Sequence, residues 1–234
     1  MPRTRDALTP RWPERVPPLP ADTPTDRPVS LLLRHGERPP LAAGEVGLAL
    51  ALTPAGLAQA QALGAALSGR LGRLHTSPIL RCRETAEALR AGARTTRAWT
   101  EDHLLGAPGV FVVDGDRARE HWHTRGNEVV LEHLAYGDER WAGLAEPRAA
   151  AHRLAAHLAG PLRAADAPVI HVFVTHDAIL LPAVARLLAA ALDRTWCPHF
   201  LEGAAFWREG DDLCLAYRTL RGRVALPVDS ERAS

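Results

Sequence analysis

The stretch Val29-Ser30-Leu31-Leu32-Leu33-Arg34-His35-Gly36-Glu37-Arg38-Pro39-Pro40 changes halfway from an apolar run to a charged one. Its apolar part, Val29 to Leu33, predicts a buried strand. Ligands of open α/β sheets bind in the crevice beyond the carboxyl ends of the strands, which is where Arg34, His35 and Arg38 are expected. Taken alone, the pattern also fits a strand end with solvated arginines.

The composition excludes several classes of function. The chain has 234 residues, 47% hydrophobic and 24% charged, which suffices for one sizeable core. A formal net charge of +1 shows no basic excess, so nucleic acid is not an expected partner. All 28 residues in the Lys+Arg count are arginine, which excludes a Schiff-base lysine and a phosphate-loop lysine. Arginine is instead suited to bidentate phosphate recognition.

The cysteines and the termini favour a cytoplasmic protein. Cys82, Cys197 and Cys214 are odd in number and widely spaced, so neither a disulfide framework nor a zinc site is expected. Residues 1–28 form a Pro- and Arg-rich arm without the apolar run of a signal peptide, and no stretch approaches transmembrane length. We expect no cofactor, no metal and no membrane contact, and we leave a homodimer open.

Strand and helix patterns alternate along residues 29–226, which predicts one α/β domain with a mainly parallel sheet. Residues 227–234 form a short tail. The stretch 99–146 breaks the pattern and is interpreted as a loop-rich insertion, the place where substrate determinants commonly lie. Gly64, inside a predicted helix, suggests close packing against a neighbouring element. The remaining expected elements are strands at 73–76 and 168–174, helices at about 53–68, 79–89, 147–162 and 178–192, and a hairpin at 204–208 and 213–218.

Two strong strands end in a histidine, and an arginine follows a third strand. His35 follows the first strand, His176 the late one, and Arg81 lies in the helix after the strand at 73–76. The carboxyl ends of parallel strands share one edge, so these residues should meet. Histidines and arginines without a cluster of acidic ligands suit a phosphate monoester, because arginines neutralise the oxygens while an imidazole attacks phosphorus.

Four segments in order resemble the histidine phosphatase superfamily, the clan that joins phosphoglycerate mutases with acid phosphatases and phytases. Residues 34–40 are similar to its Arg-His-Gly signature, and 52–60 to its "LTxxGxxQA" helix start. Residues 77–86 are similar to its "SPLxRAxxTA" segment, and 175–177 to its late histidine. The resemblance spans residues 29 to 192 and implies a three-layer α/β/α fold like that of the mutases, in which the insertion forms a lid.

The resemblance also implies roles for individual residues. His35 would be the nucleophile that forms a phosphohistidine, Arg34 and Arg81 would clamp the phosphoryl group, and His176 would complete the pocket. The clan's acid phosphatase branch carries R-H-G-x-R-x-P, and Arg38 stands at its second arginine, which implies a third phosphate-binding side chain.

Candidates in two segments compete for the general acid that protonates the leaving group. Asp177, directly after His176, stands where the acid phosphatase branch has the Asp of its His-Asp pair and is the first choice. In the mutase-like branch the acid is a Glu after the second arginine helix, for which Glu101 or Asp102 is the candidate. The expected function is hydrolysis of a small phosphorylated metabolite. Phosphoryl transfer of the mutase kind, or a non-catalytic module that binds a phosphate ligand, are the alternatives.

Overall fold

The computed structural model describes residues 19–40, 47–165 and 167–225. Most of the predicted arm, its first eighteen residues, and the tail from 226 onward lie outside the described residues. The described chain forms a seven-stranded sheet in the order β3-β2-β4-β1-β5-β6-β7. In chain order its elements are β1 (Val29–Arg34), α1 (Pro54–Ala66), β2 (Leu71–Thr76), α2 (Leu80–Gly92), β3 (Trp99–Glu101), η2 (His103–Leu105), α3 (Gly115–Tyr136), α4 (Pro147–Arg163), β4 (Ile170–Thr175), α5 (Asp177–Leu188), η3 (Arg194–Trp196), β5 (Gly203–Glu209), β6 (Asp212–Tyr217) and β7 (Leu220–Ala225).

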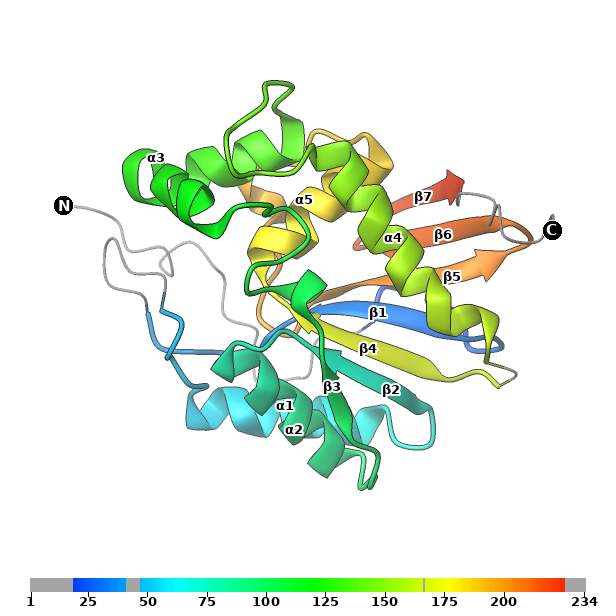
Figure 1. Ribbon diagram of the computed structural model, residues 1–234. Coiled ribbons are helices and arrows are strands. Elements are labelled where there is room, and N and C mark those ends of the chain that lie inside the picture. The colour runs from blue at the N-terminus through cyan, green and yellow to red at the C-terminus, as the bar shows by residue number, and fades with distance from the viewer. Residues whose placement is uncertain (1–18, 41–46, 166, 226–234) are drawn as a thin grey trace, which may run out of the picture.

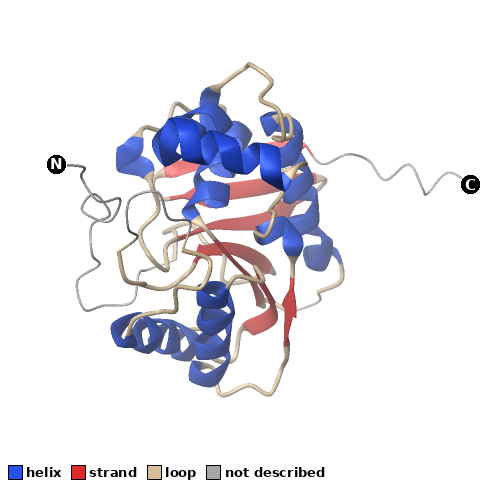
Figure 2. Ribbon diagram, turned by 60° about the vertical axis from the view of Figure 1, so that its left-hand side comes forward, coloured by secondary structure: helices blue, strands red, loops and turns tan. Residues whose placement is uncertain are grey.

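Helices cover both faces of the sheet, which confirms the three-layer α/β/α prediction. α1 and α2 lie on one face, and α4 and α5 lie on the other together with α3 (Figure 1). A view turned by 60° shows the strands between these two sets of helices (Figure 2). Alternate residues of β4 supply the two cores, since Val172 packs toward α1 and α2 while Phe173 packs toward α4 and α5.

The direction of strand pairing changes at β1. This strand pairs in parallel with β4, from Val29 with Ile170 to Arg34 with Thr175, and antiparallel with β5 on its other side. β2 also pairs in parallel with β4, and β3 with β2. The carboxyl ends of these parallel strands therefore lie at one edge, and the predicted hairpin of β5 and β6 extends the sheet beyond β1.

The two helices on one face touch through small residues, as Gly64 suggested. A Cβ atom at Gly64 would collide with the backbone of Leu89 in α2, so only glycine permits this approach. The start of α1 matches its prediction as well: the Thr53 hydroxyl accepts a hydrogen bond from the Gly56 backbone at 2.9 Å, with Pro54 in the first turn. This packing fixes α2, which carries Arg81, against the sheet.

The stretch 99–146 is more regular than its sequence suggested, because it contains the 22-residue helix α3. Gly126 interrupts this helix with φ of 82°, so the apolar positions of its two halves do not follow one period. Trp141 stacks on His133 of α3 with ring centroids 3.8 Å apart. The strand β7 was not predicted, since its alternation of Arg and Gly with apolar residues resembles a loop. None of the helices in the described ranges is long and apolar enough to cross a membrane.

Candidate active site

Three strand ends bring the predicted residues to one edge of the sheet. His35 follows β1, His176 caps the N-terminus of α5 after β4, and Arg81 lies in the first turn of α2 after β2. Their relative exposures are 2%, 9% and 8%, so the cluster is buried. A backbone hydrogen bond of 2.9 Å from His35 to Thr175 continues the pairing of β1 with β4 past the strand ends. The sheet itself therefore sets the spacing of the two histidines.

Hydrogen bonds fix the tautomer of His35. Its Nδ1 lies 2.8 Å from the Gly36 carbonyl oxygen, which can only accept, so Nδ1 carries the proton. Its Nε2 accepts a hydrogen bond from Nε of Arg81 at 3.1 Å. The lone pair of Nε2 thus faces a guanidinium, which is the orientation that a nucleophile toward phosphate needs.

His176 is oriented from both sides. Nη2 of Arg81 lies 3.2 Å from its Nδ1, and the Ser77 hydroxyl lies 3.0 Å from its Nε2. Because Arg81 can only donate, Nδ1 accepts and Nε2 donates to Ser77. The rings of His35 and His176 meet edge to face, with centroids 5.4 Å apart. One guanidinium therefore contacts both histidines.

The surroundings of His35 keep its imidazole neutral. Burial is the first cause that lowers its pKa well below the ordinary 6.5, followed by unfavourable electrostatic interactions of a protonated ring with Arg81, His176 and Arg34. The hydrogen bond to Gly36 acts in the opposite direction and is outweighed. A neutral imidazole keeps its Nε2 lone pair, so burial among cations prepares His35 for attack at and below neutral pH.

The two further arginines of the motif are buried as well. Arg34 is 2% exposed; its Nη1 donates to the Pro198 carbonyl at 2.5 Å and its Nη2 lies 3.2 Å from the Asp177 carboxylate. Arg38 is 4% exposed and donates to the Pro39 carbonyl at 2.6 Å. Phosphate contact by Arg38 stays a prediction, whereas Arg34 is joined to the first-choice acid directly.

Comparison with known proteins gives the family. A model of the histidine phosphatase superfamily (branch 1) matches residues 30–207. The chain belongs to this superfamily. None of the curated protein sequences compared with it matches.

Two solved phosphatases and a solved hydrolase share the fold. A phosphoserine phosphatase from Entamoeba histolytica, a histidine-to-alanine variant in complex with phosphoserine, is 18% identical with a TM-score of 0.53; the match covers 83% of this chain and 96% of that one. A mycobacterial glucosyl-3-phosphoglycerate phosphatase is 18% identical with a TM-score of 0.51, covering 85% and 97%. A structure described as mycobacterial hydrolase 2 is 20% identical with a TM-score of 0.53, covering 87% and 94%. At these identities the likeness concerns the fold.

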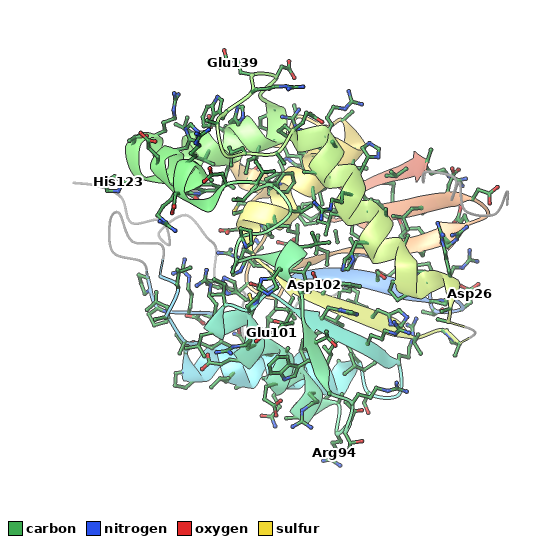
Figure 3. All side chains as sticks on the ribbon, viewed as in Figure 1. Asp26, Arg94, Glu101, Asp102, His123 and Glu139 are labelled. Atoms are coloured by element: carbon green, nitrogen blue, oxygen red, sulfur yellow. The ribbon has the colours of Figure 1, made fainter. Side chains whose placement is uncertain are left out.

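The candidate acids of this member of the superfamily lie in different surroundings. Asp177 is 6% exposed, in the first turn of α5, and its carboxylate pairs with Arg34. Glu101 lies on the edge strand β3, where its half-exposed side chain pairs with Arg83 at 3.5 Å. Asp102 follows it (Figure 3), and its carboxylate is bound by Nε2 of His157 at 2.6 Å. We call the buried cluster of Arg34, Arg81, His35 and His176 the cage. Of the three acids, Asp177 is the one whose carboxylate contacts an arginine of this cage.

Sequence reasoning missed three supports of the histidines. The Thr85 hydroxyl accepts a hydrogen bond from the Gly36 backbone at 2.9 Å and so holds the turn after His35. Ser77 orients His176, as described above. Gly106 packs against that imidazole: with φ of +151°, an added Cβ would lie 2.8 Å from Nε2 of His176. Ser77 and Thr85 lie inside the segment 77–86 that resembles the family motif. The resemblance therefore pointed to these residues, but the spacing of the sequence did not show what they contact.

The residue next to the cage, Cys82, is a packing residue. Its Sγ lies 3.5 Å from Nε2 of His176 in a fully buried position. Burial raises the pKa of the Cys82 thiol to about 12, which keeps it protonated and unreactive. Among the described residues, no three His, Cys, Asp or Glu side chains are grouped so as to hold a metal ion.

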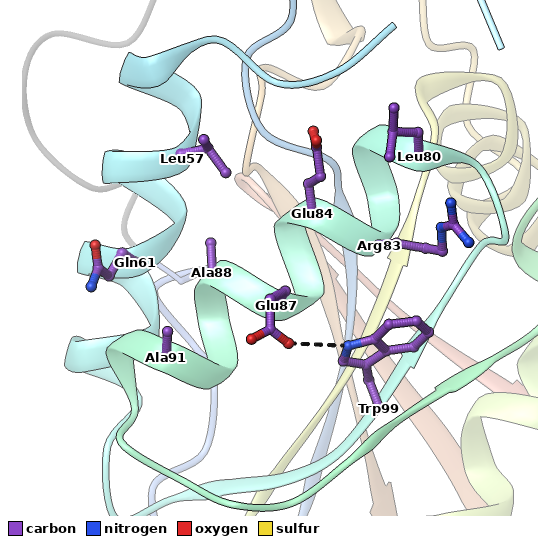
Figure 4. Close-up of a pocket in the computed structure, with 9 residues that line it drawn as sticks. All are labelled: Leu57, Gln61, Leu80, Arg83, Glu84, Glu87, Ala88, Ala91 and Trp99. Carbon is purple, nitrogen blue, oxygen red and sulfur yellow. Dashed lines mark hydrogen bonds between the residues drawn. The ribbon is translucent and has the colours of Figure 1, made fainter. Parts of the chain in front are cut away.

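A separate groove of about 460 Å³ lies on the outer side of α1 and α2 (Figure 4). Its wall includes Trp99, whose indole N–H donates to Glu87 at 3.3 Å. The groove holds neither histidine of the cage. Its full lining is Leu57, Gln61, Leu80, Arg83, Glu84, Glu87, Ala88, Ala91 and Trp99.

Proposed function

We propose that this protein hydrolyses a small phosphate monoester in two steps, through a phosphohistidine on His35. The observation that carries the proposal is the state of this imidazole, with Nδ1 donating to Gly36 and the lone pair of Nε2 turned toward Arg81. A neutral nitrogen nucleophile held among guanidiniums is what attack on a phosphate dianion requires.

In the first step Nε2 of His35 attacks phosphorus and the ester P–O bond breaks. The Nε–H of Arg81, which now points at Nε2, moves to a phosphoryl oxygen, while Arg34 contacts another. The transition state spreads charge over the equatorial oxygens, so these fixed cations lower its energy. His176, held by Ser77 and Arg81, completes the pocket beside these cations.

Asp177 supplies the proton that the leaving alkoxide takes. Its carboxylate pairs with Arg34 at 3.2 Å, and a bound phosphoryl group competes for the same guanidinium. When the phosphoryl group takes this guanidinium, the Asp177 carboxyl can carry a proton beside the ester oxygen. In the second step water attacks phosphorus, gives its proton to Asp177 and displaces His35 as the P–N bond breaks, which releases inorganic phosphate and restores the enzyme.

Trapping of the intermediate tests the nucleophile. Rapid quenching with a labelled phosphomonoester should give phosphoprotein that is stable to base and labile to acid. The label should be absent in His35→Ala and unchanged in the matched control His152→Ala, because His152 is an exposed histidine of α4. Label that persists in His35→Ala would sink the proposal.

The reaction products distinguish a phosphatase from a mutase. Release of inorganic phosphate without an isomerised phosphate ester is expected of a phosphatase, whereas a mutase returns an isomer. Turnover of an aryl phosphate that disappears in His35→Ala would exclude a silent binding module.

Leaving-group dependence tests the acid. Asp177→Asn should slow hydrolysis of alkyl phosphates by about 10²–10³-fold and of aryl phosphates far less, since aryl oxides need little protonation. Glu101→Gln is the matched variant and should change both rates by less than about threefold. Equal losses on both substrates in Asp177→Asn would remove Asp177 from this role.

A further inference from the structure

The loop that joins η3 to β5 is braced from behind by one side chain. Nη1 of Arg218 donates to the Thr195 carbonyl at 2.6 Å, and Nη2 donates to the Cys197 carbonyl at 3.0 Å. The same guanidinium holds both carboxylate oxygens of Glu202, at 2.6 and 2.8 Å. The guanidinium of Arg218 thereby joins Thr195 in η3 to Cys197 and Glu202, which lie at the two ends of the loop. A loop fastened in this way presents its outer side chains in fixed positions.

The braced loop also holds Arg34. The Pro198 carbonyl accepts from its side chain, and the backbone N–H of Leu201 donates to its carbonyl oxygen at 3.2 Å. Leu201 itself has φ of 57°, a left-handed conformation that is strained for a residue with a side chain. Such strain persists where the surrounding contacts enforce it, and here it places the preceding residue, Phe200, beside the cage.

Phe200 forms an aromatic surface at the edge of the cage. Its ring centroid lies 4.4 Å from Cζ of Arg34 and 5.7 Å from the ring centroid of His35. Arg34 and His35 are each 2% exposed, whereas Phe200 is partly exposed. Phe200 therefore contacts the buried Arg34 and His35 while part of it stays exposed to solvent. None of the roles derived above uses it.

We infer that Phe200 is a specificity-determining residue, an aromatic wall that packs against the leaving group of the substrate. The inference rests on the proposed phosphatase function and names a substrate class: monoesters with an aromatic or apolar group next to the ester oxygen. Such a group gains contact with the ring, whereas a polyhydroxylated group loses water there without a new hydrogen-bond partner. Phe200 acts on the leaving group, and Arg34 acts on the phosphoryl group.

Steady-state kinetics with benzyl phosphate and glycerol phosphate test the wall, since both leave as alkoxides. The wild-type enzyme should prefer benzyl phosphate. Phe200→Ala should lower kcat/KM for benzyl phosphate by about 10- to 30-fold, mainly through KM, and change that for glycerol phosphate by less than about threefold. Phe200→Leu keeps an apolar side chain and guards against misfolding. Its kcat/KM for benzyl phosphate should lie between those of the wild type and Phe200→Ala.

The matched control is Trp99→Leu, an aromatic deletion in the separate groove of Figure 4, which should leave both rates unchanged. Equal losses on the two substrates in Phe200→Ala would overturn the inference, because the ring would then only support Arg34. Unchanged rates in both Phe200 variants would also overturn it, and the phosphatase proposal would stand in either case. A wild-type enzyme that hydrolyses neither substrate and traps no phosphoprotein would overturn both.

Discussion

Two pairs of histidines lie in this fold, and their neighbours differ in charge. His35 and His176, with ring centroids 5.4 Å apart, share the guanidinium of Arg81. His75 and His157, 6.3 Å apart on the face that α4 covers, share the carboxylate of Asp102, at 3.9 and 2.6 Å. Histidine side chains thus surround a guanidinium in the first pair and a carboxylate in the second. The first arrangement suits a nucleophile, and the second anchors the chain.

The anchor connects elements far apart in the sequence. Asp102 accepts from the Leu104 backbone at 3.0 Å, which starts η2, while His157 belongs to α4. His75 stacks on Phe173 of β4 with centroids 4.7 Å apart. Burial raises the pKa of Asp102, but the hydrogen bond and charge of His157, the Leu104 N–H and His75 together lower it below 3.8. A carboxylate held as an anion is a structural partner and a poor general acid.

The largest expected effect is loss of the shared guanidinium. Arg81→Leu leaves Nε2 of His35 and Nδ1 of His176 without their donor and should lower kcat/KM by about 10³-fold or more. Arg90→Leu, on the exposed side of the same helix where the side chain pairs with Glu87, is the control and should change kcat/KM by less than about twofold. A small loss in Arg81→Leu, measured by steady-state kinetics, would remove the distinction between the two histidine pairs.

The next effect concerns stability. Asp102→Ala removes the cap of η2 and the acceptor of His157, and should lower the free energy of unfolding by about 2–3 kcal/mol in urea denaturation. The matched control Asp116→Ala breaks only an exposed pair with Arg119 and should stay within about 0.5 kcal/mol. An equal loss of unfolding free energy in the two variants would contradict a structural role for Asp102 and its two histidines.

Acid should lower the stability of the fold in two pH windows, one set by buried histidines and one by Asp102. His35 and His171 have lowered pKa values, that of His171 falling to about 4, mainly through burial. Below 6.5 the unfolded chain binds more protons than the fold, so stability drops as pH falls toward 4, by about 1.4 kcal/mol per unit for each such histidine. The lowered pKa of Asp102 instead removes stability below 3.8.

Denaturation of His171→Leu between pH 6.5 and 4 measures the first window. As pH falls, the free energy of unfolding of the variant should decrease less steeply than that of the wild type, by about 1.4 kcal/mol per pH unit. Parallel curves would contradict the expected neutral state of His171.

The smallest effect is that of the second histidine pair on catalysis. His157→Gln keeps a donor for Asp102 and should change kcat by less than about threefold, with phosphoprotein still formed. His157→Leu, which removes the donor, should destabilise the protein more than it slows it. A kcat loss in His157→Gln as large as that in Arg81→Leu would show that the two pairs act as one unit.

Local sequence patterns predicted three of the four parallel strands; the fourth, β3, lies in the stretch 99–146 that was interpreted as loop-rich. The apolar run before Arg34 and the β-branched run before His176 predicted β1 and β4, because buried parallel strands are apolar on both faces. The structure then brought His35, Arg34, Arg81, His176 and Asp177 together. Helix α3 escaped prediction because Gly126 divides its period, and β7 escaped because an edge strand needs no apolar face.

The amino-acid sequence by itself determined the chemical types at the strand ends: two histidines, several arginines and an aspartate, with no lysine to compete. Only the tertiary structure decided which of them face one another. It pairs the Asp102 carboxylate with His157, away from the cage. It also brings Phe200 beside Arg34, although the two are 166 positions apart in the sequence. The physical reason is that protonation state and contact depend on burial and on charges from distant segments, which no local pattern contains. The stretch from Val29 to Pro40 therefore contains the proposed nucleophile, His35, and the packing around it lowers the pKa of this imidazole.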